Sequence, residues 1–361
     1  MQYRRLGRTE LEVSIVSFGA IKLPEVSANQ AARAVNLALD LGVNFIDTAR
    51  AYKDSERKIG QALRSRREEF YLATKTVARD AAGSRADLET SLRELGMDYI
   101  DLWQLHTVST REEWEKVMGP GGAVETGQKA LQEGLIRHFG ITIHRELSVM
   151  REAITSGLFE TIMLAYSPLD QEGVAAEILP LAAEHDLGVI IMKPLSGGQL
   201  VRPPEQRQPG LGGADAVIAG SLRYCLSNPN VTCVIPGMKS PQEVEENVAI
   251  ADPFVPLSDE EEDELRRQIA AMGKDFRYGQ VCLRCGYCLP CPAGINIPEV
   301  MRALDMKRGY PHALKHLGDE LYASLEVKAS ACQDCAQCEE QCVAGLPIRD
   351  QMREAVGLFE V

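Results

Sequence analysis

Short runs of apolar and β-branched residues recur along the first 270 positions, and amphipathic stretches separate them. This rhythm predicts parallel strands joined by helices, because strands covered by helices are apolar throughout. Eight such strands fit a closed (β/α)8 barrel. The predicted strands span residues 13–18, 43–48, 70–75, 99–105, 135–142, 161–166, 188–193 and 231–236. We therefore expect an α/β fold in which residues 1–272 form a TIM barrel and residues 273–361 form a second, smaller, mainly α domain.

Several of the intervening helices carry the capping-box signature at their start, in which a Ser or Thr side chain and a Glu or Gln three residues later exchange hydrogen bonds with the backbone. The pairs are Ser27 with Gln30, Thr110 with Glu113, Ser240 with Glu243 and Ser258 with Glu261. Two long segments rich in glycine and proline follow the fourth and seventh strands, at 107–124 and 194–213. Both are expected to be substrate or cofactor loops.

Composition narrows the class of protein. A net charge of -13 disfavours a broad nucleic-acid surface, because phosphate backbones need clustered Lys and Arg. The first 14 residues lack the apolar region of a secretion signal, and no apolar run approaches the roughly 20 residues that span a bilayer. We expect a cytoplasmic protein that binds neither nucleic acid nor membrane. In that reducing compartment, closely spaced cysteines are metal ligands more often than disulfides.

Four residues that can move or stabilise a proton stand at the ends of consecutive predicted strands. They are Asp47, Tyr52, Lys75 and His106. Each alone has a structural explanation, as a turn cap, a loop base, a solvated strand end or a buried histidine. In a parallel barrel, however, the carboxyl ends of the strands share one face, where chemistry gathers.

A free tyrosine has a pKa of about 10, which makes it a poor acid near neutral pH. We expect the ammonium of Lys75 to lower the pKa of Tyr52, and Asp47 to keep Lys75 charged and in place. His106 can then hydrogen-bond a substrate oxygen while the carbonyl carbon receives a hydride.

These residues belong to stretches that resemble the aldo-keto reductases. The matching pieces are residues 44–63, 73–75, 98–106 and 234–248, and the resemblance covers about residues 1–272. It implies a (β/α)8 barrel that reduces an aldehyde or ketone with NADPH or NADH, or runs the reverse reaction, with Asp47, Tyr52, Lys75 and His106 as the catalytic residues. The small-molecule carbonyl substrate is not identified by the sequence.

The resemblance also places the nucleotide, since PGMKS (236–240) leads into a helix whose free N–H groups can meet a phosphate. Lys239 favours NADPH, whereas Glu243 would repel a 2'-phosphate, so NADH stays open. Thr142 and Ile143, Met163 and Met192 depart from the usual nicotinamide contacts, and His144 could face the pocket or the surface. The candidate cofactor-binding residues are Thr142, Pro194, Leu195, Gly237, Lys239, Ser240, Glu243, Glu246 and Asn247.

The tail contains two runs of four cysteines with CxxC spacing. The first is Cys282, Cys285, Cys288 and Cys291, and the second is Cys332, Cys335, Cys338 and Cys342. Zinc usually takes two separate CxxC pairs, whereas eight thiols match two [4Fe-4S] clusters. One cluster plus a zinc ion is the alternative. The segments 291–304 and 342–355 also resemble each other, as in a duplicated module.

The tail resembles the bacterial two-cluster ferredoxins, and the whole chain resembles a subgroup of aldo-keto reductases with such a tail. The resemblance implies crossed ligation, in which Cys342 joins the first cluster and Cys291 joins the second. The clusters could relay electrons to or from a partner such as a ferredoxin, or act as structural staples. The alternative function is a sensor whose nucleotide and cluster state control binding to a partner.

Overall fold

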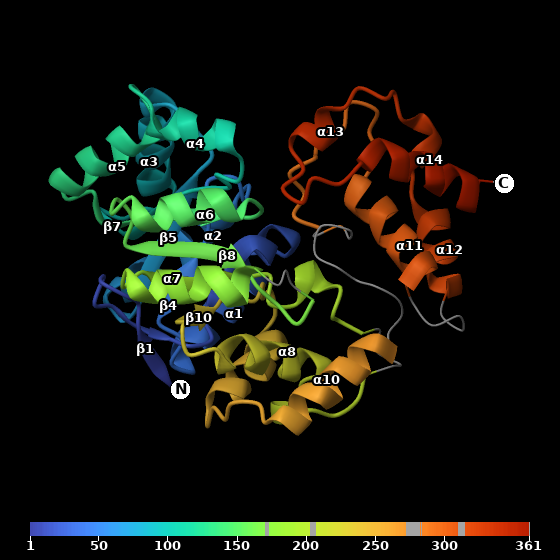
Figure 1. The fold of residues 1–361 in the computed structure, drawn as a ribbon, viewed down its shortest axis with the longest axis horizontal. Coiled ribbons are helices and arrows are strands. Elements are labelled where there is room, and N and C mark those ends of the chain that lie inside the picture. The colour runs from blue at the N-terminus through green and yellow to red at the C-terminus, as the bar shows by residue number, and fades with distance from the viewer. Residues whose placement is uncertain (170–172, 203–206, 272–281, 283, 310–314, 361) are drawn as a thin grey trace.

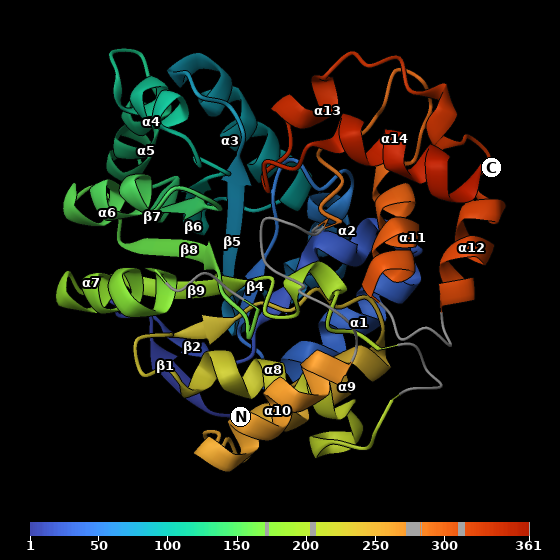
Figure 2. The same cartoon turned by 45° about the vertical axis from the view of Figure 1, so that its right-hand side comes forward.

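The chain folds around a parallel sheet that closes on itself (Figures 1 and 2). The computed structural model describes residues 1–169, 173–202, 207–271, 282, 284–309 and 315–360. Eight strands follow one another in sequence order around the sheet: β3 (Phe18–Gly19), β4 (Phe45–Asp47), β5 (Tyr71–Thr76), β6 (Ile100–Leu105), β7 (Ile136–Ile143), β8 (Thr161–Ala165), β9 (Gly188–Met192) and β10 (Cys233–Val234). Parallel bridges from Val16 to Val234 and from Gly19 to Gly237 join the first strand to the last.

Ten helices of the described residues follow these strands or pack beside them. They are α1 (Ala28–Asp40), α2 (Ser55–Leu63), α3 (Ala81–Leu95), α4 (Arg111–Met118), α5 (Ala123–Gln132), α6 (Leu147–Thr155), α7 (Leu179–Glu184), α8 (Ala216–Ser227), α9 (Pro241–Val248) and α10 (Asp259–Ala271). The predicted capping boxes are present at α1, α4 and α10. At α9 the Ser240 hydroxyl accepts from the Glu243 N–H, but the Glu243 carboxylate accepts from the N–H of Lys239 instead. No described helix is long and apolar enough to cross a membrane.

The first predicted strand, 13–18, is only partly correct. Residues Glu12–Ser14 form β2, which pairs antiparallel with β1 (Tyr3–Arg5) outside the barrel, and only Phe18 of the predicted run lies in a barrel strand. The hairpin brings Leu6 and Val13 into the apolar cluster formed by the inward side chains of the barrel strands. The apolar pattern of this run therefore reflects burial at one end of the barrel as well as in its wall.

Gly19 stands where the barrel closes. A Cβ atom at this position would lie 2.7 Å from the main-chain oxygen of Ile235 and 2.8 Å from that of Pro236. The Gly19 N–H donates to the Pro236 oxygen at 3.1 Å, which requires this close approach of the two backbones. Only glycine fits here without moving β10.

The tail is helical and has an apolar core of its own. Its helices are α11 (Ile297–Gly309), α12 (Lys315–Ser324), α13 (Gln337–Glu340) and α14 (Ile348–Phe359). Val300 and Leu304 of α11 pack with Met352 of α14, and most of the cysteine side chains border this cluster. The predicted boundary between residues 272 and 273 lies outside the described residues.

The tail contacts the barrel through the segment that follows β9. The buried Gln199 side chain donates to the Asp305 carboxylate of α11 at 2.7 Å and to the Cys282 carbonyl at 3.2 Å. Burial raises the pKa of Asp305 to about 6. These contacts hold the start of the first cysteine run against the carboxyl ends of the barrel strands.

Candidate active site and cysteine cavities

The four predicted proton-handling residues come together at one end of the barrel. Asp47 ends β4, Lys75 lies in β5, and His106 follows β6 directly. Because β5 pairs in parallel with β4 on one side and with β6 on the other, Lys75 lies between Asp47 and His106. The ammonium of Lys75 donates to the Asp47 carboxylate at 2.5 Å and to the Thr48 carbonyl at 2.6 Å.

Tyr52 reaches the same place from the loop after β4. Its ring meets the His106 ring edge to face, with centroids 5.7 Å apart, and the Lys75 nitrogen lies 5.2 Å from the centre of the Tyr52 ring. The Lys75–Asp47 pair is almost completely buried, with 1% and 3% of the two side chains exposed. Burial opposes both charges, lowering the pKa of Lys75 and raising that of Asp47, while their mutual attraction acts against both shifts.

The expected lowering of the Tyr52 pKa is wrong for this structure. Burial is the largest effect and raises the pKa, and the Asp47 carboxylate raises it further. The Lys75 ammonium, which was expected to oppose this shift, donates to Asp47 and Thr48. Tyr52 is therefore held as a protonated phenol, the form that can donate a proton.

His106 is held neutral. Burial, and then the positive charges of Lys75 and Arg79, lower its pKa well below the ordinary value. Its buried Nδ1 has no hydrogen-bond partner among the described residues, whereas its Nε2 lies 2.8 Å from the hydroxyl of Tyr287. His144, for which the sequence left two positions open, is buried rather than on the surface, and burial also lowers its pKa.

Tyr287 is the residue of this site that sequence reasoning missed. It comes from the tail, between Cys285 and Cys288, and its ring meets the His106 ring edge to face at 5.6 Å. The Tyr52 ring packs against the same imidazole, at 5.7 Å. The one sequence signal for it is that Tyr287 is the only tyrosine within the first cysteine run.

The predicted nucleotide residues at the start of α9 lie together. The Lys239 ammonium pairs with Glu25 at 2.7 Å, and the Glu243 carboxylate caps the helix start. Asn247 is buried, whereas Glu246 accepts a hydrogen bond from Gln242 at 2.7 Å in an exposed position.

The remaining predicted cofactor residues lie elsewhere around the barrel end. The Thr142 hydroxyl accepts from the Thr107 N–H at 2.7 Å. Gly237 pairs with Gly19 at the barrel closure, and Pro194 and Leu195 follow β9, where Leu195 packs on the barrel core. The structure brings these positions to the rim but does not join them into one contact network with α9.

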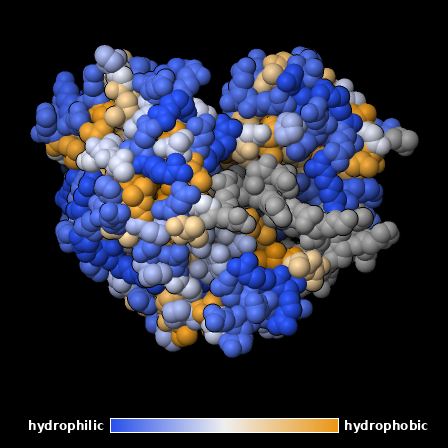
Figure 3. Space-filling view, in the orientation of Figure 1, coloured by the Kyte–Doolittle hydropathy of each residue, from blue (hydrophilic) through white to orange (hydrophobic). Residues whose placement is uncertain are grey.

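A groove of about 1750 Å³ separates the barrel end from the tail. Figure 3 shows it from outside as the hollow between the two lobes. Tyr52 and Lys239 line it from the barrel, and Tyr287 and Arg302 line it from the tail. A molecule in this groove would lie against Tyr52 and against Lys239, which directly precedes Ser240 at the start of α9.

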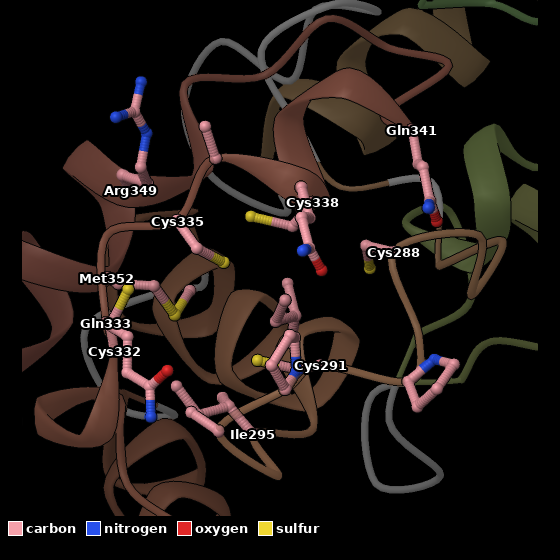
Figure 4. A pocket seen from close by; sticks show the side chains of 16 residues that line it. Cys288, Cys291, Ile295, Cys332, Gln333, Cys335, Cys338, Gln341, Arg349 and Met352 are labelled. Atoms are coloured by element: carbon pink, nitrogen blue, oxygen red, sulfur yellow. The ribbon is translucent and has the colours of Figure 1, made fainter.

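The eight tail cysteines line two small cavities. The first is lined by Cys282, Cys285, Cys288 and Cys342. The second, shown in Figure 4, is lined by Cys288, Cys291, Cys332, Cys335 and Cys338. Each cavity thus draws cysteines from both runs. Burial raises the pKa of the Cys288 thiol to about 12.

The thiols of each cavity match the donor set of an iron–sulfur cluster, although they are not gathered tightly. Among the residues described, no three Cys, His, Asp or Glu side chains stand close enough together to hold a single metal ion. A cluster differs from a single ion because its ligands bind separate iron atoms around a cube. The first cavity is lined by four cysteines and the second by five, with Cys288 shared, and these thiolate donors suit a cluster better than a single ion.

The fold and the proton-handling residues define an oxidoreductase barrel, and comparison with known proteins gives the family. The sequence profile of the Aldo/keto reductase family matches residues 16–211, and the chain belongs to that family. It is 28% identical over 294 residues to the uncharacterized oxidoreductase YqkF of Bacillus subtilis, covering 70% of this chain and 92% of that protein.

Solved structures agree with this assignment. The holo form of aldo-keto reductase AKR11C1 from Bacillus halodurans aligns with a TM-score of 0.63 and 30% identity, covering 77% of this chain and 98% of that one. An aldo-keto reductase from Klebsiella pneumoniae, in complex with NADPH, aligns with a TM-score of 0.61 and 25% identity, covering 76% and 98%. In both cases about a quarter of this chain lies beyond the likeness.

Proposed function

We propose that this protein reduces an aldehyde or ketone to an alcohol, or runs the reverse reaction, with Tyr52 as the proton donor. The observation that carries the proposal is the meeting of a protonated phenol, a neutral imidazole and a buried ion pair at the carboxyl end of the barrel. A bound NADPH or NADH would supply a hydride to the carbonyl carbon. The proton of the Tyr52 hydroxyl goes to the carbonyl oxygen, which completes the alcohol.

Each neighbour of Tyr52 has a physical role in this step. The neutral His106 can donate from Nε2 to the substrate oxygen and so orient the carbonyl group. The Lys75 ammonium lies 5.2 Å from the centre of the Tyr52 ring, so it would attract the phenolate that forms when Tyr52 gives up its proton only weakly, against the larger effect of burial. Asp47 keeps that ammonium charged in a site that excludes water.

The carbonyl-reduction proposal is tested by replacing the phenol. Tyr52→Phe should reduce turnover of a carbonyl compound by about a hundredfold or more, the usual worth of a general acid, while the Kd for NADPH changes little. Tyr3→Phe, in which an exposed tyrosine of β1 loses a hydroxyl that donates to Gly42, is the matched control. A Tyr52→Phe protein with unchanged turnover would refute the role of Tyr52.

We propose NADPH as the preferred nucleotide. The NADPH complex of the Klebsiella pneumoniae reductase supports this choice. The Glu243 carboxylate, which could repel a 2'-phosphate, is already engaged by the N–H of Lys239. The Lys239 ammonium could reach a phosphate by leaving the half-exposed Glu25, which is a small cost for an exposed pair. A tenfold lower KM for NADH than for NADPH would contradict this preference.

We propose that the tail, residues 273–361, is a ferredoxin-like domain that holds two [4Fe-4S] clusters with crossed ligation. The grouping of Cys342 with the first run and of Cys291 with the second run supports this pairing. The chemistry that such clusters supply is one-electron transfer or the cross-linking of a small domain. We favour the structural role, because most of the cysteine side chains pack on the small apolar core of the tail.

The cluster proposal is tested by metal content. The anaerobically purified protein should contain about eight iron and eight sulfide ions per chain. Cys342→Ser and Cys291→Ser should each lower the iron content by up to half, and Cys233→Ala in β10 should leave it unchanged. One cluster and a zinc ion in the wild-type protein would contradict the proposal. Bleaching of the clusters by NADPH without oxygen would contradict the structural role and support a relay.

A further inference from the structure

The hydroxyl of Tyr287 lies at the point where two barrel residues converge. It lies 2.8 Å from Nε2 of His106. The rings of Tyr287 and Tyr52 both meet the His106 ring edge to face, at 5.6 and 5.7 Å, so the two phenols are neighbours of one imidazole. The tail therefore places an oxygen atom on the imidazole nitrogen that we assign to the substrate oxygen, near the proton donor Tyr52.

The tail backbone is shaped to place this phenol. Gly286, directly before Tyr287, has a φ of +78°, a conformation that other residues rarely adopt, although no atom would crowd a Cβ there. Cys285 and Cys288 on either side line the first cysteine cavity. Gln199 holds the carbonyl of Cys282 at the start of the same run. Tyr287 is thus fixed between the cysteine cavity and the barrel end.

We propose that Tyr287 is a substrate-site residue contributed by the tail, whose hydroxyl occupies the position of the substrate oxygen and must leave before a carbonyl group can bind to Tyr52 and His106. This inference rests on the proposed carbonyl reduction. Nε2 of His106 cannot hydrogen-bond the Tyr287 hydroxyl and a substrate oxygen at the same time. Tyr287 therefore competes with the substrate, and only a compound that can replace its ring and its oxygen reaches the proton donor.

The competition predicts opposite effects from those of an ordinary binding residue. If Tyr287 helped to hold the substrate, removing its hydroxyl would weaken binding. If Tyr287 is a competitor, removing the hydroxyl strengthens binding, because the substrate no longer displaces the hydrogen bond between Tyr287 and His106. Tyr287→Phe retains the ring that packs on His106, and Tyr287→Ala removes ring and hydroxyl together.

Benzamide is a suitable probe, because its ring approximates the tyrosine ring and its carbonyl oxygen accepts hydrogen bonds without being reduced. Calorimetry on the complex with NADPH should show a Kd for benzamide that is roughly three- to tenfold lower for Tyr287→Phe than for the wild type, and lower still for Tyr287→Ala. The KM for benzaldehyde should fall in the same order, with kcat maintained. Tyr3→Phe should change neither constant, and the iron content of each variant shows that the tail is intact.

Weaker or unchanged benzamide binding by Tyr287→Phe would overturn the inference, as would failure of Tyr287→Ala to bind benzamide at all. The binding measurement does not depend on turnover. If the variants bind benzamide in the expected order but the protein reduces no carbonyl compound, the inference about Tyr287 stands and the proposed carbonyl reduction is refuted. If the protein reduces benzaldehyde but neither variant changes the Kd for benzamide or the KM for benzaldehyde, the inference about Tyr287 is refuted and the proposed carbonyl reduction stands.

Discussion

Replacing Lys75 with methionine tests whether its ion pair with Asp47 holds the barrel together. The two charges lie 2.5 Å apart, and 1% and 3% of their side chains are exposed. At that distance the attraction amounts to about 7 kcal/mol at an effective dielectric constant of about 20, before the cost of burying both ions. Without Lys75, the Gln104 amide, at 3.3 Å, would be the only side-chain hydrogen-bond partner that the Asp47 carboxylate retains among the described residues.

The cost of Lys75→Met is limited by protonation of Asp47. Protonating a carboxyl group of ordinary pKa costs about 4 kcal/mol at pH 7 and about 1.5 kcal/mol at pH 5. The Thr48 carbonyl also loses its donor, which adds about 1 kcal/mol at either pH. We therefore expect Lys75→Met to lower the free energy of unfolding by about 5 kcal/mol at pH 7 and by about 2.5 kcal/mol at pH 5.

The sign of this pH dependence follows from the protonation states. In the variant, the buried Asp47 has a raised pKa, so the folded state binds a proton that the unfolded state has lost. Stability is then retained at low pH and is lost as the pH rises above about 4, the pKa of the unfolded state. Asp47→Asn in the Lys75→Met background should remove most of the difference between the two pH values.

The assay can follow the barrel alone. Both tryptophans of the chain, Trp103 and Trp114, are buried in the barrel, so their fluorescence in urea reports its unfolding. Lys116→Met, which removes the exposed partner of Glu112 in α4, should change stability by less than about 0.5 kcal/mol. An equal loss at pH 5 and pH 7 for Lys75→Met would refute the reasoning.

Three further predictions concern His106 and two glycines. Because burial holds the pKa of His106 well below its ordinary value, the histidine is neutral at and above about pH 6.5. The dependence of kcat on pH between about 6.5 and 8 should therefore be the same in the wild type and in His106→Gln. Gly60→Ala should destabilise the barrel by more than about 1 kcal/mol in tryptophan-monitored unfolding, because the new Cβ would lie 2.3 Å from the Leu95 oxygen. Gly357→Ala, in α14 with no atom within 4 Å, should raise the melting temperature of the tail slightly, and a loss there would contradict the helix-propensity argument.

Much of the barrel could be predicted from sequence because its strands are apolar on both faces and each is followed by a helix. The predicted strand 161–166 differs from β8 by one residue at one end, and the predicted strand 70–75 differs from β5 by one residue at each end. The predicted strand 13–18 was only partly correct, because burial of Val13 against the barrel end produces the same apolar pattern as burial within the barrel wall.

The candidate site was predictable where local sequence determines position. Asp47, Lys75 and His106 end consecutive strands, so the parallel ladder brings them together. The pKa of Tyr52 was not predictable, because it depends on burial by the whole site and on the direction in which the Lys75 ammonium points. Tyr287 is about 180 residues from His106 in the chain, and no periodic pattern encodes a contact made by docking of the tail.

The sharing of cysteines between the two cavities bears on how the tail assembles. Cys342 lines the first cavity and Cys291 lines the second, so neither wall is complete until both halves of the tail are present. During synthesis, the wall of the first cavity can be completed only after Cys342, in the second run, has been made. A chain cut between the two runs would lack part of both walls at once, and neither half could serve as an independent module.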